Sequence, residues 1–390
     1  MPDRPVETVR AEKMAAGGDA IAHLADGRVV FVDGALPGED VRVEVHSDKR
    51  DFARARVLDV LTPSHARVQP PCPELARGCG GCAWQHVEPT AQRSLKAEIV
   101  ADALRRTAKL DAASVVDGGG VPPWAYRTTM RLAVGTDGRV GLRGAASHDV
   151  IALDACMVAH PALSALLPAV RVRGAKELTL RVSAATGEVT AMADRPGARI
   201  TGLPPSALVG AEAVLHEDVL GARLRVSAGS FFQSGPAAAA LLVGAVMHAA
   251  GERLTIDGPV LDAFGGVGLF AAALPLRDAV IVESSRSACA DARVNVPEAE
   301  VVCTPFERWT PRPVEWAVVD PARAGLGRDA AAVLAAAGPR RVVLVSCDPV
   351  SLARDAVLLA AHGYSLRDSV VLDLFPHTPH VEVVSVFDRA

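Results

Sequence analysis

The sequence has few aromatic side chains, no long apolar run and no excess of basic charge. Phe, Trp and Tyr together make up 4% of the 390 residues, so any surface that stacks bases has to be built from few side chains. No apolar run reaches about eighteen residues, which excludes a transmembrane helix by length. The first ten residues carry charges where a signal peptide needs an apolar stretch, so we expect a cytoplasmic protein with no membrane partner.

The formal net charge is −4, so the whole molecule does not attract nucleic acid, and any RNA binding requires local basic patches. The chain contains seven cysteines. Disulfides are rare in the cytoplasm, and clustered cysteines there indicate a metal site or catalysis.

Residues 1–66 are predicted to form short strands, because their valine-rich stretches are broken by Gly, Pro and Asp. In one stretch Phe52, Arg54 and Arg56 alternate with small apolar residues, which places an aromatic ring and two guanidinium groups on one strand face. This pattern predicts a small OB-like β-barrel of the kind that binds oligonucleotides. A solvated strand face without a ligand accounts for the arginines equally well.

Residues 67–235 are predicted to form a mixed α+β central domain. It begins with a cysteine cluster and a helix near Thr90 to Leu110. Two hairpins follow, one turning at Asp137-Gly138 and one near Gly187.

Residues 236–390 alternate apolar strand runs with helical stretches, which predicts an α/β domain with a doubly wound, Rossmann-like parallel sheet. The last two runs, VVLDLF and VEVVSVF, are separated only by the short PHTPH. A helix does not fit there, so the sheet is predicted to end in an antiparallel hairpin.

A glycine-rich turn follows the first strand of this domain, in LDAFGGVG. It lets the backbone turn sharply, and it places Asp262 and Gly266 where a nucleoside-binding sheet meets its cofactor. Glu283 ends the next strand, about twenty residues later, where a carboxylate can accept hydrogen bonds from the hydroxyl groups of a ribose. The turn does not match the dinucleotide fingerprint, so it does not choose between cofactors, and a strand-to-helix turn without a ligand remains an alternative.

Three further residues are expected near the same sheet edge. Asp320 and Cys347 end the fourth and fifth strands, and the carboxyl ends of parallel strands line the ligand crevice. A thiol there attacks an electrophilic carbon when it is ionised, although a buried core cysteine is the alternative. Glu382 follows PHTPH and is a candidate general base, while we interpret His377 and His380 as structural.

The segment CPELARGCGGCAWQH brings three thiols within eleven residues, and the Cys-Gly-Gly-Cys turn lets two of them converge on one metal ion. Cys72, Cys79 and Cys82 are three ligands of a zinc site or of an iron–sulfur cluster, and spacing does not decide between these. Cys156 is the remaining candidate for the fourth ligand, since Cys289 and Cys303 are interpreted as core thiols.

Five segments, in order, resemble the RNA 5-methyluridine methyltransferase family, in the branch with an N-terminal TRAM domain and a four-iron, four-sulfur cluster. The segments are FFQSGP, LDAFGGVGLF, VVDPARAG, SCDPVSLARD and DLFPHTPHVE. The resemblance implies S-adenosylmethionine-dependent methylation of carbon 5 of an unpaired or flipped uridine in RNA. It favours ribosomal RNA over transfer RNA, and we expect the protein to act as a monomer.

The resemblance also implies a role for individual residues. Cys347 matches the nucleophile that adds to carbon 6, and Glu382 matches the base that removes the proton from carbon 5. The positions that match the cofactor site are Gln233, Phe264, Glu283 and Asp320. The positions that match the ligands of the [4Fe-4S] cluster are Cys72, Cys79, Cys82 and Cys156. Arg127 and Arg131 are expected to touch RNA phosphates.

The sequence departs from the family pattern at three positions near these segments. Leu269 stands where an Asn contacts the cofactor, Ala322 replaces the second proline, and Asp348 replaces the Asn after the nucleophile. None of these changes removes a chemical group that the reaction needs. Two alternatives are a methyltransferase that acts on another nucleophile and a non-catalytic RNA-binding protein that kept the TRAM and cluster domains.

Overall fold

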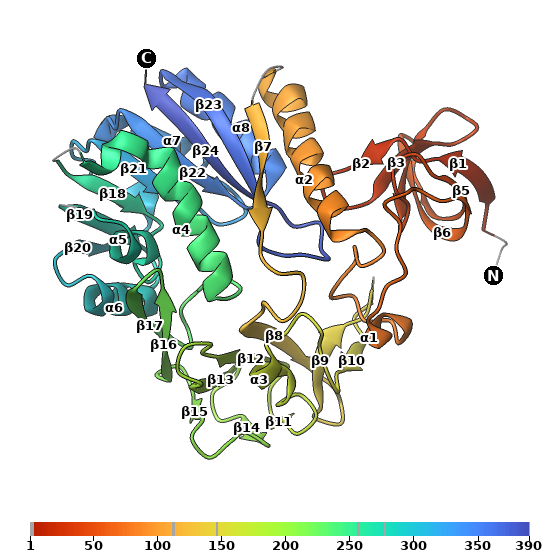
Figure 1. Cartoon of the computed structure of the whole chain (residues 1–390), viewed down its shortest axis with the longest axis horizontal. Coiled ribbons are helices and arrows are strands. Elements are labelled where there is room, and N and C mark those ends of the chain that lie inside the picture. Colours follow the sequence, from red (N-terminus) through yellow and green to blue (C-terminus); the bar gives the residue numbers. More distant parts are fainter. Residues whose placement is uncertain (1–3, 111–113, 146, 256–257, 277, 390) are drawn as a thin grey trace.

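The structure is a computed structural model, and it describes residues 4–389 apart from 111–113, 146, 256–257 and 277. Three larger sheets organise the chain, one N-terminal, one central and one C-terminal (Figure 1). Within these described ranges, no helix has both the length and the apolarity needed to cross a membrane.

The N-terminal sheet has six strands in the order β1-β5-β6-β4-β3-β2 and curls around its own apolar core. Its strands are β1 (Val6–Arg10), β2 (Lys13–Met14), β3 (Ala20–His23), β4 (Val29–Asp33), β5 (Asp40–Asp48) and β6 (Phe52–Thr62). In β6, Ala53 and Ala55 are buried while Arg54 and Arg56 are exposed, so the predicted alternation is confirmed.

The central segment folds around a second sheet, in the order β10-β9-β8-β12-β13-β15, which is antiparallel apart from the parallel pairing of β15 with β13. Both predicted hairpins are present in it. Its strands are β8 (Thr129–Val134), β9 (Val140–Arg143), β10 (Val150–Ala152), β12 (Glu177–Val182), β13 (Val189–Ala193) and β15 (Leu208–Val209). Two small two-stranded sheets accompany it, β11 (Arg171–Arg173) paired with the distant β14 (Arg199–Thr201) and the hairpin of β16 (Val214–Val219) with β17 (Ala222–Ser227). The short helices of this region are α1 (Pro73–Ala76) and α3 (Pro161–Ser164).

The C-terminal sheet has eight strands in the order β20-β19-β18-β21-β22-β24-β23-β7. Its strands are β18 (Val260–Ala263), β19 (Ala279–Glu283), β20 (Glu300–Cys303), β21 (Trp316–Val319), β22 (Arg341–Ser346), β23 (Tyr364–Asp373), β24 (Glu382–Arg389) and β7 (Ser114–Gly120). The first five in this order pair in parallel, and β24 pairs antiparallel with both neighbours. The predicted parallel sheet and terminal hairpin are therefore confirmed.

Helices cover both faces of this sheet, which is why its central strands β18, β19 and β21 are apolar along nearly their whole length. Along β18, Val260 faces the layer of α4, and Leu261 faces the layer of α7 and α8. The helices of the domain are α4 (Pro236–Ala250), α5 (Leu269–Ala273), α6 (Arg286–Asn295), α7 (Gly327–Ala337) and α8 (Pro349–Ala361), with the short helices η2 (Gly251–Thr255) and η3 (Phe306–Arg308).

The structure differs from the expected three-part division in one respect. Strand β7 and the preceding helix α2 (Pro89–Ala103), with its π-helical extension η1 (Leu104–Ala108), come from the segment 67–235 but pack on the C-terminal sheet. Figure 1 shows α2 between that sheet and the N-terminal barrel. Sequence order alone does not show this, because β7 pairs with β23 about 250 positions later in the chain.

Candidate active site

Several strands of the C-terminal sheet end at one edge, where the candidate residues gather. Strands β18, β19, β21 and β22 end beside one another because they pair in parallel. Strand β24 runs antiparallel to β22, so its first residue lies at the same edge. The side chains brought together there are Phe264, Glu283, Asp320, Cys347 and Glu382.

A cavity of about 650 Å³ opens at this edge, a volume in the range of small-molecule sites. Both predicted catalytic residues and all but one of the predicted cofactor residues lie on its wall. The candidates on the wall are Cys347, Glu382, Gln233, Phe264, Gly266, Glu283 and Asp320.

The glycine turn and Glu283 form one half of the cavity. The Glu283 carboxylate accepts hydrogen bonds from the backbone N–H of Gly266 (3.1 Å) and of Ser285 (2.6 Å), which orients it at the end of β19. Gly266 has a φ of +55°, and a Cβ added there would meet nothing within 4 Å. The turn therefore presents backbone and a carboxylate to open space, which suits a ligand with hydroxyl groups.

Asp262 is the predicted cofactor residue that does not line the cavity. It is fully buried beneath the glycine turn, where its Oδ2 accepts from the Ala271 N–H (3.3 Å) and its Oδ1 has no hydrogen-bond partner among the described residues. Burial raises the pKa of Asp262 to about 7. The missing Cβ of Gly265 makes this arrangement possible, because a Cβ would lie 2.7 Å from Ile281 and 3.0 Å from Asp262.

Cys347 lies at the other end of the cavity, half-buried, one residue beyond β22. Burial raises the pKa of its thiol to about 11, and the negative charges of Glu382 and Asp320 raise it further, while Arg323 lowers it. Arg323 is the positive charge that favours the thiolate form of this sulfur.

Two carboxyl groups face this thiol from neighbouring strands. Burial, and then the charge of Asp320, raises the pKa of Glu382 well above its usual value. Burial also raises the pKa of Asp320 to about 7. A carboxyl group with a raised pKa in a closed cavity is suited to accept a proton near neutral pH.

The segment between β23 and β24 contributes residues that the sequence interpretation did not place in the site. His380, expected to be structural, lines the cavity, and its Nδ1 lies 3.4 Å from the Arg323 guanidinium. Burial, followed by the charges of Arg323 and Arg127, lowers the pKa of His380 to about 4, so the ring is neutral at pH 7. The Arg127 guanidinium lies over the Phe375 ring, 5.6 Å from its centroid.

Phe231 and Arg323 were also missed, although both stand in segments used for the family resemblance. Phe231 is 71% exposed and lines the cavity beside Gln233, so an aromatic ring is free at the mouth. The signal that could have found them was their position next to the selected residues, in FFQSGP and VVDPARAG.

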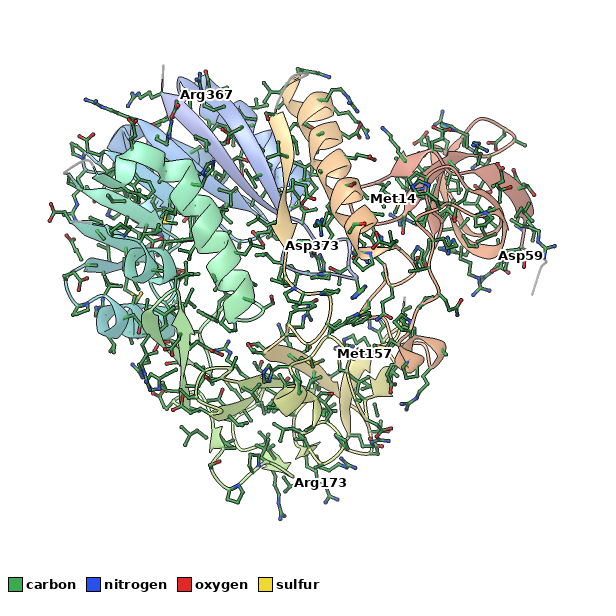
Figure 2. All side chains as sticks on the ribbon, in the orientation of Figure 1. Met14, Asp59, Met157, Arg173, Arg367 and Asp373 are labelled. Carbon is green, nitrogen blue, oxygen red and sulfur yellow. The ribbon has the colours of Figure 1, made fainter. Side chains whose placement is uncertain are left out.

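The four predicted metal-ligand cysteines come together around a second, small cavity. Cys72, Cys79, Cys82 and Cys156 all line it, and Met157, labelled in Figure 2, lies on its wall. Burial raises the pKa of Cys79, and the charges of Cys156 and Cys72 raise it further. Among the described residues no His, Cys, Asp or Glu group has the geometry of a formed metal site. Cys289 is buried as expected, whereas Cys303 is exposed at the end of β20.

Two basic features that were considered for RNA contacts form ion pairs or line different surfaces. On the barrel, Arg54 pairs with Asp19 (2.9 Å) and Arg56 with Glu44 (2.9 Å), so that strand face is less basic than its sequence indicates. Arg127 lines the main cavity, but Arg131 does not. Arg131 pairs with Glu177 on the neighbouring strand of the central sheet.

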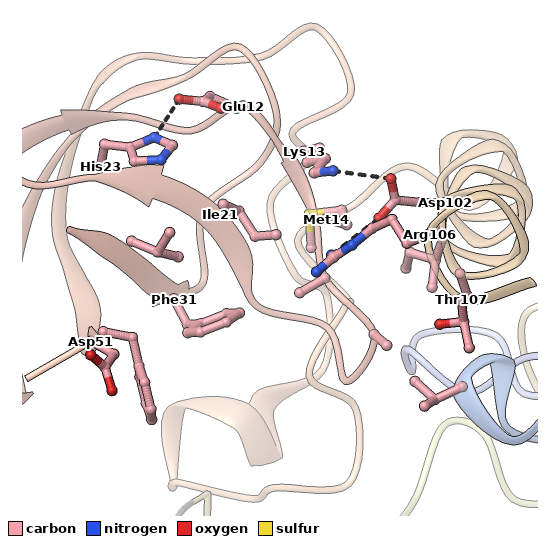
Figure 3. A pocket seen from close by; sticks show the side chains of 17 residues that line it. Glu12, Lys13, Met14, Ile21, His23, Phe31, Asp51, Asp102, Arg106 and Thr107 are labelled. Atoms are coloured by element: carbon pink, nitrogen blue, oxygen red, sulfur yellow. Dashed lines mark hydrogen bonds and ion pairs between the residues drawn. The ribbon is translucent and has the colours of Figure 1, made fainter. Parts of the chain in front are cut away.

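A further cavity, of about 800 Å³, lies between the barrel and α2 and contains none of the predicted site residues (Figure 3). Lys13 of the barrel donates across it to Asp102 of α2 (3.0 Å). This cavity is a gap between the barrel and α2, and the Lys13–Asp102 ion pair spans the gap.

Comparisons with known proteins agree with this geometry. Residues 6–58 match the TRAM domain family. The chain is 37% identical to an uncharacterized RNA methyltransferase of Streptomyces avermitilis, over 97% of this chain and 96% of that protein. It is 34% identical to the 23S rRNA (uracil(1939)-C(5))-methyltransferase RlmD of Pectobacterium atrosepticum, over 93% of this chain and 89% of that protein. The chain belongs to the RNA (uracil-C5) methyltransferase family.

The family assignment agrees with the shape of the whole chain. The crystal structure of Pyrococcus abyssi tRNA (uracil-54, C5)-methyltransferase in complex with S-adenosyl-L-homocysteine superposes with a TM-score of 0.71. The match covers 98% of this chain and 100% of that one at 23% identity, which shows a shared fold. The enzyme is an RNA (uracil-5-)-methyltransferase, and the resemblance to the TRAM-bearing RNA 5-methyluridine methyltransferases is confirmed, while the iron–sulfur cluster stays a prediction.

Proposed function

We propose that the enzyme methylates carbon 5 of a uridine in large-subunit ribosomal RNA through a covalent bond between Cys347 and carbon 6. The observation that carries the proposal is the convergence of Cys347, Asp320 and Glu382 on one cavity. Ribosomal RNA is favoured because the Pectobacterium relative, which bears a 23S rRNA name, matches most of the chain at 34% identity.

The covalent route solves a problem of reactivity. Carbon 5 of uracil is a weak nucleophile, whereas attack of the Cys347 thiolate on carbon 6 breaks the ring double bond and places its electron pair on carbon 5 as an enolate. Arg323 stabilises the thiolate that this step requires. After carbon 5 has been methylated, Glu382 removes its proton, the double bond forms again, and the Cys347 thiolate leaves.

The residues around the glycine turn fit S-adenosylmethionine. The Glu283 carboxylate is oriented to accept hydrogen bonds from ligand hydroxyl groups. Phe264 offers an apolar surface in the same cavity, and Gly266 leaves room for a ligand. When bound, this cofactor supplies the methyl group as an electrophilic sulfonium. The acidic Asp320 lies between this half of the cavity and Cys347, where it complements a positive charge.

The target base has to leave its stack to reach this cavity. Phe231 is the exposed aromatic ring at the mouth and Arg127 is a cation on the wall, and together they suit a base and a phosphate. We propose that residues 1–66 form an RNA-binding unit and that residues 67–235 carry the cysteines and lend α2 and β7 to the C-terminal sheet. Residues 236–390 form the rest of the methyl-transferring unit.

The four cysteines fit an iron–sulfur cluster. Thiolates from Cys72, Cys79, Cys82 and Cys156 form a Cys₄ donor set, and leucine, methionine and valine side chains surround it. A Cβ on Gly80 would lie 2.9 Å from the Ala145 backbone nitrogen and 3.0 Å from the Arg143 carbonyl oxygen, so the close approach of this loop requires glycine. We propose that these residues hold a [4Fe-4S] cluster.

Two variants test the chemistry. Cys347→Ala should abolish methylation while S-adenosylmethionine binding persists, and the exposed Cys303→Ala is the matched control. Glu382→Gln should still form the carbon 6 bond but leave the carbon 5 proton in place, and it should accumulate a protein–RNA adduct that survives denaturing electrophoresis. RNA containing 5-fluorouridine should trap the unmodified enzyme in the same way.

The covalent mechanism is wrong if Cys347→Ala keeps a tenth of the rate, because a tenfold loss is only about 1.4 kcal/mol of barrier. If Glu382→Gln is inactive without forming an adduct, another residue is the base. Absence of S-adenosylmethionine binding would favour the non-catalytic alternative.

A further inference from the structure

The segment that leads into the proposed base, Glu382, is held by hydrogen bonds from residues that precede the C-terminal domain in the chain. It runs from Phe375 to Val381, directly before Glu382. From α2, Gln92 accepts from the His377 N–H (2.6 Å), and Lys96 donates to the Phe375 carbonyl (3.2 Å). The Trp84 backbone N–H donates to the His377 carbonyl (2.9 Å).

A further contact with this segment comes from the TRAM barrel. Gly18 lies in the turn between β2 and β3, and its carbonyl accepts a hydrogen bond from the Trp84 indole N–H (3.0 Å). A Cβ added to Gly18 would lie 2.7 Å from the Cβ of Pro379 and 2.8 Å from its Cγ. The barrel backbone therefore sits directly against Pro379, with no room for a side chain.

The barrel is also anchored at a second point. The Lys13–Asp102 ion pair ties β2 to α2 across the cavity drawn in Figure 3. Helix α2 in turn holds the Phe375–Val381 segment through Gln92 and Lys96. The turn that bears Gly18 is thus fixed relative to the segment that it touches.

We propose that the Gly18 turn of the TRAM barrel is a positioning element for the catalytic base. By packing against Pro379 it sets the path of the two residues, His380 and Val381, that lead into Glu382. This inference rests on the proposed role of Glu382. It makes the barrel part of the turnover step as well as of RNA binding.

The geometry gives the size of the effect. Carbon atoms in contact lie about 3.5–4.0 Å apart. A Cβ added at Gly18 and the Cβ of Pro379, at 2.7 Å, therefore have to move apart by about 0.8 Å or more. A misplacement of about 1 Å in an active site can lower the rate about 100-fold. Gly18→Ala should therefore lower kcat by about tenfold to 100-fold.

The neighbouring glycine supplies a matched control. Gly17 has the same φ of +103° as Gly18, but a Cβ added there would meet nothing within 4 Å. Gly17→Ala and Gly18→Ala therefore share the same backbone strain and differ in the contacts with Pro379 and with the Trp84 indole nitrogen, which lies 3.0 Å from the Cβ added at Gly18. Single-turnover and steady-state kinetics on full-length RNA should show kcat reduced in Gly18→Ala relative to Gly17→Ala. KM for RNA and the Kd for S-adenosylmethionine should stay within about twofold of the control.

A second readout separates positioning from loss of structure. Because the carbon 5 proton is then removed slowly, Gly18→Ala should accumulate the same covalent adduct as Glu382→Gln, whereas Gly17→Ala should not. Equal kcat and no adduct in either glycine variant would overturn the proposal, and so would a rise in KM with kcat unchanged. Glu382→Gln without an adduct would instead reject the proposed base, independently of the glycine comparison.

Pro379→Gly tests the same contact from the other side and leaves the barrel sequence intact if Gly18→Ala does not fold. It should lower kcat and accumulate adduct, and activity equal to that of the unmodified enzyme would overturn the proposal. The variant that combines Gly18→Ala with Pro379→Gly should have a kcat no lower than that of the slower single variant, because both changes act on one contact. If the fold-decreases in kcat of the two single variants multiply in the double variant, the two residues act separately, and the proposal is wrong.

Discussion

The buried ion pair between Lys96 and Asp373 gives the sharpest prediction about stability. Lys96 of α2 is 0% exposed and Asp373, at the end of β23, is 4% exposed, with 2.6 Å between Nζ and Oδ1. Figure 2 labels Asp373 near the middle of the molecule. Burial lowers the pKa of Lys96, and the Asp373 carboxylate counteracts this. Each charge is therefore tolerated only because the other is present.

Lys96→Met keeps most of the side-chain volume but leaves the Asp373 carboxylate buried without its cation. Breaking such a pair costs about 3–5 kcal/mol. At about 2–4 °C per kcal/mol for a domain of this size, the unfolding temperature of the C-terminal domain should fall by about 6–20 °C. Differential scanning calorimetry at neutral pH measures this shift.

Two comparisons make the result interpretable. Lys96→Met combined with Asp373→Asn removes both charges and should recover most of the loss, because no uncompensated charge stays buried. Arg340→Met, which breaks an exposed pair with Glu315, should cost less than about 1 kcal/mol. The reasoning fails if Lys96→Met costs no more than Arg340→Met, or if the double variant is as unstable as Lys96→Met.

Three other predictions concern the cofactor, the cluster and the reactive groups. Glu283→Ala should weaken S-adenosylmethionine binding by about 1.5–3 kcal/mol in calorimetry, and unchanged affinity would place the ribose elsewhere. Anaerobically purified protein should be brown, with broad absorption near about 400 nm that Cys79→Ser bleaches, and colourless protein with one zinc would reject the cluster. Because burial raises the pKa of Cys347 to about 11, kcat/KM should rise about tenfold per pH unit between about pH 7 and 9, and a flat profile would contradict thiolate attack.

A last prediction follows from the buried carboxyl group under the glycine turn. Burial raises the pKa of Asp262 from 3.8 to about 7, so between these values the native state binds more protons than the unfolded state. The cofactor-free protein should therefore become more stable as the pH falls from about 8 toward 5, and Asp262→Asn should weaken that dependence. Thermal unfolding across this pH range measures the effect, and an Asp262→Asn profile identical to that of the unmodified protein would count against it.

Local patterns were enough to predict most elements of this protein. The strand runs that became β18, β19, β21 and β22 are apolar on both faces, and a short apolar run bounded by turn residues indicates a buried parallel strand wherever it stands. The alternation around Arg54 and Arg56 fixed the orientation of β6, because successive side chains point to opposite faces. Reactive residues at strand ends, such as Asp320 and Cys347, follow from the same logic, since parallel strands end at a common edge.

The sequence by itself therefore determined the doubly wound sheet, the hairpins and the residues at the strand ends that meet at the sheet edge, such as Glu283, Asp320 and Cys347, because these depend on neighbours in the chain. Only the tertiary structure decided that β7 joins that sheet, that Asp262 lies beneath the cavity, and that Gly18 packs against Pro379. These features join residues far apart in sequence, and they depend on how side chains of different units fill shared space. The local sequence pattern of one segment does not show which distant segment will pack against it, because each segment forms its own helix, strand or turn from its neighbours in the chain.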